Sequence, residues 1–98
     1  MNYFKFQVSA TDTHVVPANN ILAIEVENAN SVKVRCVGNT GDNNADIYDL
    51  TATDKAKAVQ VAIISAANQP VNTSGAFIDV AAIDGVSAIS KSLGQTSN

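Results

Sequence analysis

The sequence predicts an α+β fold: a strongly bent antiparallel sheet, or small open barrel, with one helix late in the chain. Three observations lead to this prediction. Apolar and polar residues alternate with a period of two along much of residues 4–50, which is typical of half-buried strands. Residues 54–69 contain neither Gly nor Pro and carry apolar residues at helical spacing. Strand-like runs return after Pro70, so strands both precede and follow the helix.

The first predicted strand covers residues 4–9, where two Phe and one Val alternate with polar residues. We expect the aromatic side chains of Phe4 and Phe6 to face the core, because side chains of a strand point alternately to its two faces. Tyr3 and Lys5 then lie on the outward face. A turn, a short extended segment and a second turn follow at residues 10–12, 13–16 and 17–20.

Residues 21–27 and 31–37 are predicted to form an antiparallel hairpin with a tight connection at residues 28–30. The residues expected to point inward from this hairpin are Leu22, Ile24, Val26, Val32, Val34 and Cys36. On the opposite face, the carboxylates of Glu25 and Glu27 are expected to pair with Lys33 and Arg35 across the two strands.

The rest of the chain supplies a turn, one more strand, the helix and two short strands. Thr51 to Asp54 resembles a capping box, with Asp in place of Glu, at the start of the helix. The remaining elements are expected as a turn at 38–44, a strand at 45–50, a helix at 54–69, a loop at 71–75, strands at 77–82 and 86–89, and a turn at 84–85. We expect a single domain over residues 1–98, with an ordered core at about 2–90 and a polar, frayed C-terminal tail at 91–98.

Composition excludes several classes of protein. The 98 residues are 46% hydrophobic and 15% charged, which is too apolar for an intrinsically disordered chain. Cys36 is the one cysteine, so the chain is not a disulfide scaffold. No apolar run approaches the roughly 20 residues that a membrane span needs. The first residues show no secretory signal, so we expect neither secretion nor a membrane partner.

Catalytic and metal-binding motifs are not apparent, and we expect no enzyme, no catalytic residue, no metal and no cofactor. Nothing in the spacing brings His14 to Cys36, and Cys36 is expected to face the core as a small apolar residue. Residues 42–46 place oxygens as a calcium loop does, but Ile47 and Thr53 stand where such a loop needs Gly and Glu. A turn is the better interpretation. Gly-rich phosphate-binding motifs are missing from the sequence.

Nucleic-acid binding is weakly indicated by the residues alone. Six Lys and Arg against nine Asp and Glu give a formal charge of −3, which disfavours a protein built to hold duplex DNA. Single-strand binding instead combines aromatic rings with nearby cations. The residues available for it are Tyr3, Lys5, Lys33, Arg35 and Tyr48. The plainer interpretation, solubilising charges and two edge tyrosines, is favoured as long as the residues are considered alone.

Three segments of the sequence, residues 16–25, 49–54 and 80–86, resemble a family of small marine cyanophage-associated proteins known from ocean metagenomes. The resemblance covers about residues 3–90 and consists of patterns of apolar and turn residues. That family is similar in fold to Sm-like proteins, which are small bent barrels that assemble edge to edge into rings and bind RNA. Sm-like proteins usually begin with a helix, whereas the helix comes late here. Their RNA-binding loop residues find no match, so no binding residue is carried over.

The resemblance implies a phage-encoded, Sm-like homo-oligomer that acts as an accessory factor binding single-stranded RNA or DNA. Its copies would join through edge strands, since an open sheet leaves edges that invite pairing. The cytoplasm of an infected host cell or the phage particle is the expected location. The alternative is a structural or decoration subunit of a phage particle with no nucleic-acid role. The acidic composition, the neutral loops rich in Asn, Thr and Ser, and the absence of catalytic motifs are well suited to this alternative.

Overall fold

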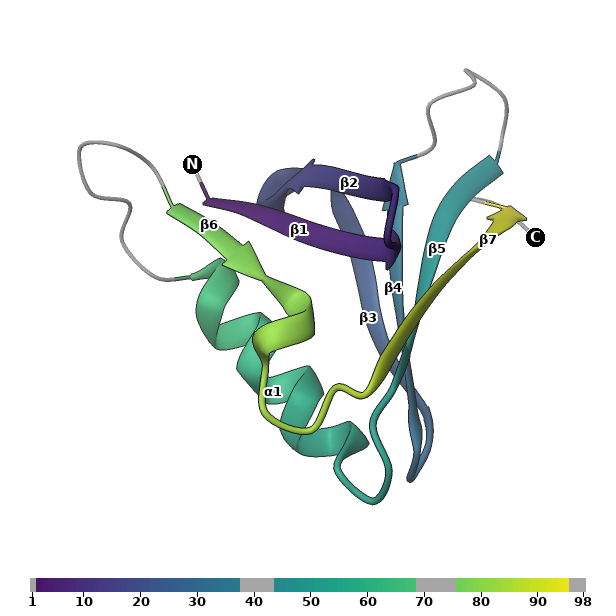
Figure 1. Cartoon of the computed structure of the whole chain (residues 1–98), viewed down its shortest axis with the longest axis vertical. Coiled ribbons are helices and arrows are strands. Elements are labelled where there is room, and N and C mark those ends of the chain that lie inside the picture. Colours follow the sequence, from purple (N-terminus) through teal and green to yellow (C-terminus); the bar gives the residue numbers. More distant parts are fainter. Residues whose placement is uncertain (1, 38–43, 69–75, 96–98) are drawn as a thin grey trace.

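The computed structural model describes residues 2–37, 44–68 and 76–95, and its strands lie in two sheets that face each other (Figure 1). The first sheet has the order β2-β1-β6 and is made of β1 (Asn2–Ser9), β2 (Asp12–Pro17) and β6 (Ala76–Asp79). The second has the order β3-β4-β5-β7 and is made of β3 (Ile21–Asn28), β4 (Ser31–Val37), β5 (Asn44–Thr51) and β7 (Ala88–Gln95). One α-helix, α1 (Ala56–Ala67), and two 3₁₀ turns, η1 (Ala18–Asn20) and η2 (Val80–Ala82), complete the fold. The predicted α+β class with one late helix is confirmed, although the described strands do not close into a barrel.

The first sheet follows the predicted alternation of β1. Asn2, Phe4 and Phe6 are buried, whereas Tyr3 and Lys5 lie on the outward face. Strand β2 pairs with β1 antiparallel, but β6 pairs with it parallel. The expectation of a purely antiparallel sheet is therefore wrong. The parallel pair is possible because β2 to β5 and α1 intervene between the two strands, which supplies the long crossover that parallel neighbours need.

The predicted hairpin is present as β3 and β4, joined by the two residues Ala29 and Asn30. Its predicted cross-strand ion pairs are also present, with Lys33 paired to Glu27 and Arg35 to Glu25. Two of the six residues expected to point inward are exposed. Val26 is the register partner of the buried Val32 but is itself 40% exposed. Leu22 was assigned to the wrong position. The register shifts between Ile21 and Ala23, which is a β-bulge, and Leu22 is consequently 53% exposed.

The core lies between the two sheets and under α1. Phe6 of the first sheet stacks on Tyr48 of the second, with ring centroids 4.1 Å apart and planes inclined by 10°. Val59 and Ile63 of α1 are completely buried against the same core, as their helical spacing predicts. Gln60 ties the helix to the sheet, because its side-chain amide donates to the carbonyl of Ile24 at 2.8 Å.

The start of α1 differs from the predicted capping box. The helix begins at Ala56, the N-cap Lys55 makes no side-chain cap, and Asp54 has a φ of 60° that places it outside the helix. The hairpin turn serves in place of a cap. Asn30 Oδ1 accepts from the Asp54 amide at 2.9 Å, and the Ala29 carbonyl accepts from the Ala56 amide at 3.3 Å. The free N–H group of Ala56, in the first helical turn, is thus satisfied by a tertiary contact.

The C-terminal third departs furthest from the predictions. Strand β6 ends at Asp79 rather than at residue 82, because the Asp79 carboxylate caps η2 by accepting from the Ala81 amide at 3.2 Å. The strand expected at 86–89 and the described part of the frayed tail expected at 91–98 are replaced by β7, which pairs with β5 from Thr51↔Ala88 to Asn44↔Gln95. Residues 96–98 lie outside the described residues. The predicted turn at 38–44 and loop at 71–75 fall mostly or wholly outside the described residues.

Gly85 is the glycine whose conformation the fold requires. Its φ is 103°, and a Cβ added there would lie 3.0 Å from Lys55 Cδ and 3.3 Å from Val59 Cγ2.

We predict that Gly85→Ala lowers the free energy of unfolding by about 1–3 kcal/mol, because an alanine there is destabilised both by the positive φ and by the close contact of its Cβ. Guanidinium denaturation measures the change. Lys57→Ala, at an exposed position of α1, is the control and is expected to unfold like the wild type; an unchanged midpoint for Gly85→Ala would contradict the prediction.

Candidate nucleic-acid interface

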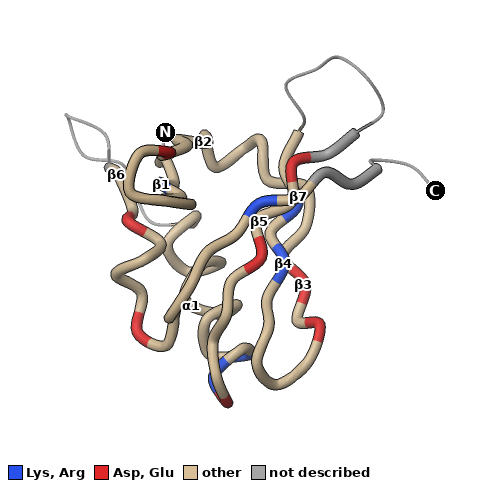
Figure 2. The backbone as a smooth tube through the Cα atoms, turned by 45° about the vertical axis from the view of Figure 1, so that its right-hand side comes forward, with Lys and Arg blue, Asp and Glu red and all other residues tan. Residues whose placement is uncertain are grey.

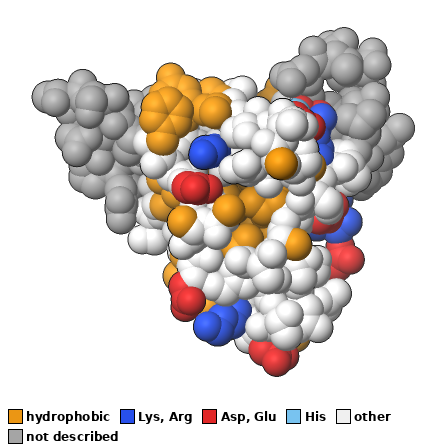
Figure 3. Space-filling view, in the orientation of Figure 1, with side chains coloured by type: hydrophobic (Ala, Val, Ile, Leu, Met, Phe, Trp, Pro, Cys, Tyr) orange, Lys and Arg blue, Asp and Glu red, His pale blue; other side chains and the backbone are white. Residues whose placement is uncertain are grey.

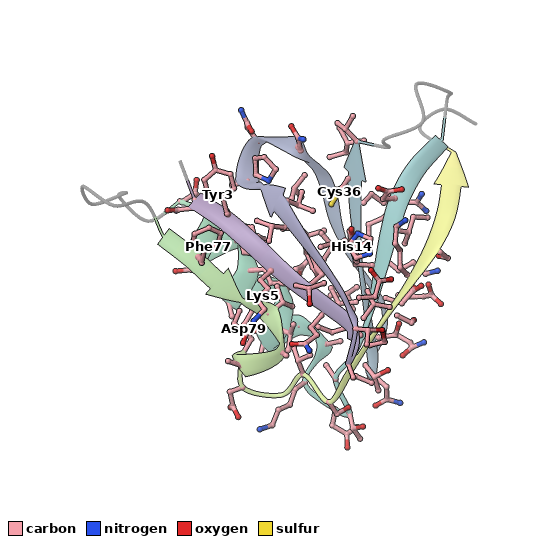
Figure 4. The ribbon with its side chains drawn as sticks, turned by 45° about the horizontal axis from the view of Figure 1, so that its top comes forward. Tyr3, Lys5, His14, Cys36, Phe77 and Asp79 are labelled. Carbon is pink, nitrogen blue, oxygen red and sulfur yellow. The ribbon has the colours of Figure 1, made fainter. Side chains whose placement is uncertain are left out.

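The outward face of the first sheet brings residues from both ends of the chain into two rows. In the register of the strands, Tyr3 lies between Pro17 and Phe77. Lys5 lies two residues further along, with Asp79 beside it on β6. Figure 4 shows Tyr3, Phe77, Lys5 and Asp79 along the β1–β6 pair. We call Tyr3, Phe77, Lys5 and Asp79 the aromatic platform.

Two aromatic rings form one row of the platform. The rings of Tyr3 and Phe77 stack with centroids 5.6 Å apart and planes inclined by 26°. Phe77 is 69% exposed, more than any other large hydrophobic residue in the described part of the chain. Figure 3 shows this region as an apolar patch bordered by one basic and one acidic group. Exposed aromatic faces of this kind are surfaces on which nucleic-acid bases stack.

The second row carries one cation and one carboxylate. Lys5 and Asp79 are register partners on neighbouring strands, yet no salt bridge joins Lys5 to any described residue. Asp79 Oδ1 accepts from the Ala81 amide, which fixes the direction of the carboxylate. Both charged groups therefore keep hydrogen-bonding capacity for a ligand that rests on the neighbouring rings.

Lys33 and Arg35, also expected to bind nucleic acid, are not part of the platform. They lie on the outward face of the second sheet, which points away from the first sheet because the inward faces of the two sheets meet in the core. Figure 2 shows basic and acidic residues side by side along β3, β4 and β5. The salt bridges on this face are Lys33–Glu27 at 3.1 Å, Lys33–Asp49 at 3.3 Å and Arg35–Glu25 at 2.6 Å.

Electrostatics makes this second face unattractive to phosphate. Two cations stand there against three carboxylates. Hydrogen bonds to Glu27 and to Asp49 raise the pKa of Lys33, so its positive charge is held by the carboxylates that surround it. A cation already neutralised by its neighbours contributes little to counterion release from a nucleic acid.

The expectation that Tyr48 offers a free ring is wrong. Its side chain is 1% exposed, stacked on Phe6 and contacted edge-on by the His14 ring, with centroids 5.7 Å apart. Burial raises the pKa of its hydroxyl above the ordinary value, so the group stays neutral. Next to it, His14 Nε2 lies 3.0 Å from Asp12 Oδ1. Tyr48 is a core residue that also borders a small polar pocket of about 330 Å³ between β2 and β5.

Sequence reasoning found Tyr3 and Lys5 but missed Phe77 and Asp79. The strand containing Phe77 was predicted, and alternation places Phe77 and Asp79 on one face of it. What the sequence does not reveal is that β6 pairs parallel to β1, because no turn joins the two strands and fixes their register. The pairing is a tertiary contact between residues more than 70 positions apart.

Other kinds of site find no support in the described residues. Within them, no three His, Cys, Asp or Glu side chains lie together so that they could hold a metal ion. Among the same residues, no helix is long and apolar enough to cross a membrane. Comparison of the chain with protein-family models, with curated proteins and with solved structures gives no match.

Cys36 lies in the core at 1% exposure, as predicted. Its burial, and to a smaller extent the negative charge of Asp46, raise the pKa of the Cys36 thiol to about 12. The thiolate is the reactive form, so native Cys36 is expected to be inert at pH 8. We predict that a disulfide reagent labels it at least about a hundredfold more slowly in the native protein than in guanidinium, as followed by absorbance. Equal labelling rates in the two states would contradict the buried position.

Proposed function

We propose that the protein is a small accessory factor that binds single-stranded RNA or DNA by stacking bases on the aromatic platform. The observation that carries this proposal is the stacked Tyr3–Phe77 pair, of which Phe77 is 69% exposed. Burying such a ring under a base removes apolar surface from water, and stacking contributes about 1–3 kcal/mol per base. An aromatic pair with one largely exposed ring is well suited to this role.

Charge supports single strands over duplexes as the ligand. Lys5 is the one cation on the platform, and Asp79 beside it carries the opposite charge. Duplex nucleic acid presents mainly phosphates outside its grooves, and its bases are already stacked on one another. A nearly neutral aromatic surface on a chain of net charge −3 gains little from phosphates but can gain from free base faces.

Assembly of several copies is part of the proposal, together with the phage setting and the Sm-like architecture that the sequence resemblance implies. The second sheet ends in two strands, β3 and β7, that have one neighbour each. Beside β3 lies an apolar groove of about 320 Å³, bordered by Leu22, Ile24 and Ile64. A second copy pairing with this edge would cover the exposed Leu22, although Gln60 already occupies the Ile24 carbonyl.

Light scattering tests the assembly. We expect a mass that is a multiple of the 10.2 kDa chain, and we expect Leu22→Lys to shift the protein toward the single chain, because it places a charge in the apolar groove. Val15→Lys is the matched control, since Val15 is comparably exposed but belongs to the first sheet. A wild-type mass equal to one chain would remove the oligomer from the proposal.

Nucleic-acid binding is tested by fluorescence anisotropy with short labelled single-stranded RNA and DNA. Phe77→Ala is expected to weaken binding by about fivefold to 150-fold, the equivalent of one lost stacking contact. Val61→Ala, which truncates an exposed apolar residue of α1, should leave binding unchanged. The dissociation constant should rise only weakly with salt, with a logarithmic slope of about +0.7, because a single cation is available.

Two results would contradict the proposal. One is the absence of binding to any single strand at low salt, where electrostatic attraction is strongest. The other is binding that Phe77→Ala does not weaken but that the double variant Lys33→Ala/Arg35→Ala abolishes, which would transfer the interface to the second sheet. The first result would favour the alternative of a structural subunit, which predicts stoichiometric amounts of the protein in purified particles.

A further inference from the structure

We propose that the aromatic platform prefers guanine among the bases of a single strand, with Asp79 and Lys5 contacting the edge of the base that stacks on Tyr3 and Phe77. This inference rests on the proposed function and adds a base specificity to it. Its starting point is the position of the second row. Lys5 and Asp79 lie two residues beyond Tyr3 and Phe77 on the same strands, a distance of about 6.6 Å along the sheet.

Asp79 is held ready to accept hydrogen bonds. Its Oδ1 accepts from the Ala81 amide at 3.2 Å, so the carboxylate is oriented by the backbone of η2. Its Oδ2 has no partner among the described residues. Two carboxylate oxygens offer about four lone pairs, so both oxygens can still accept from a ligand. An acceptor fixed in this way loses little conformational entropy when it binds.

Lys5 supplies the donor next to this acceptor. It is the register partner of Asp79, and neighbouring strands lie about 4.8 Å apart. No salt bridge joins Lys5 to Asp79, so neither side chain consumes the hydrogen-bonding capacity of the other. The row therefore presents a donor and a two-oxygen acceptor on neighbouring strands.

Guanine is the base whose edge fits this arrangement. Its N1–H and 2-amino groups are adjacent donors that a carboxylate can accept together, and its O6 is an acceptor for the Lys5 ammonium. Adenine would turn its N1 lone pair toward the carboxylate. Uracil, thymine and cytosine each offer a single donor group beside acceptor atoms. For these bases, a carboxylate oxygen is left facing an acceptor, which costs binding free energy.

The presence of the Asp79 carboxylate also favours contact of the second row with bases rather than with the sugar–phosphate backbone of the nucleic acid. Asp79 would repel a phosphate placed near Lys5, whereas it attracts the donor edge of guanine. A row built for phosphate would carry cations at both positions. The pairing of one cation with one carboxylate is thus a better match for a base edge than for the sugar–phosphate chain.

The test uses short oligothymidines with one central guanine, inosine, adenine or cytosine, and measures dissociation constants by anisotropy. We expect the guanine probe to bind at least about tenfold more tightly than the adenine probe, within the range of a bidentate base contact. Inosine lacks the 2-amino group and should fall between them. Asp79→Asn, which retains an oxygen to cap η2, should lower the affinity for the guanine probe to about that for the adenine probe.

Asp84→Asn is the matched control, because it removes a highly exposed carboxylate away from the platform. It should preserve the guanine preference. Equal affinity for all four probes in the wild type, with binding still weakened by Phe77→Ala, would overturn the guanine inference and leave the proposed function standing. A guanine preference that survives in Asp79→Asn would also overturn it. Failure of every probe to bind would overturn both.

Discussion

The stack of Phe6 on Tyr48 is the contact that joins the two sheets, and the rest of the structure depends on it. The two ring centroids are 4.1 Å apart, which leaves no space between the rings, so the inward face of β1 is buried in the core. Aromatic pairs of this kind add about 0.5–1.5 kcal/mol beyond the burial of their surface. Because strand side chains alternate, the commitment of Phe4 and Phe6 to the core forces Tyr3 and Lys5 outward. The exposed aromatic surface is thus a consequence of how the core is built.

The position of Phe77 depends on anchors at its C-terminal side. Strand β6 has four residues, so its register is held by few backbone pairs with β1. Ile78 packs against the core, the Asp79 side chain caps η2, and Val80 is completely buried. These neighbours fix the backbone on which Phe77 is carried, so its ring is presented to solvent from a defined place. A ring held in advance loses less conformational freedom when a ligand covers it.

The sequence predicts what local pattern controls, and it does not predict what tertiary contact controls. Alternation and turn residues located β1 to β5 and the hairpin ion pairs, and the Gly- and Pro-free segment located α1. Strand β7 was predicted only at residues 88–89, because the polar remainder of this edge strand has no apolar alternation to reveal it. Leu22 was misassigned because a bulge leaves no signature in composition. Tyr48 was misassigned because both faces of β5 carry apolar residues, so alternation cannot tell which face is buried. Half of the aromatic platform was found, since Phe77 and Asp79 join it through a parallel pairing that no local pattern specifies.

Net charge has a different meaning once the positions of the charges are known. Four of the six cations form salt bridges with carboxylates, so they add little to the attraction of phosphate. In the sequence alone, the net charge of −3 disfavours a protein built to hold duplex DNA and lowers the expectation of nucleic-acid binding without removing it. For a protein that would bind nucleic acid through a pair of aromatic rings, the same negative charge affects duplexes and single strands differently. It disfavours a duplex, whose accessible surface is dense in phosphate, and it weakens contact with a single strand less, because stacking and base-edge hydrogen bonds do not depend on counterion release. An acidic chain with an exposed aromatic platform is therefore consistent with a binder that reads bases and avoids double helices.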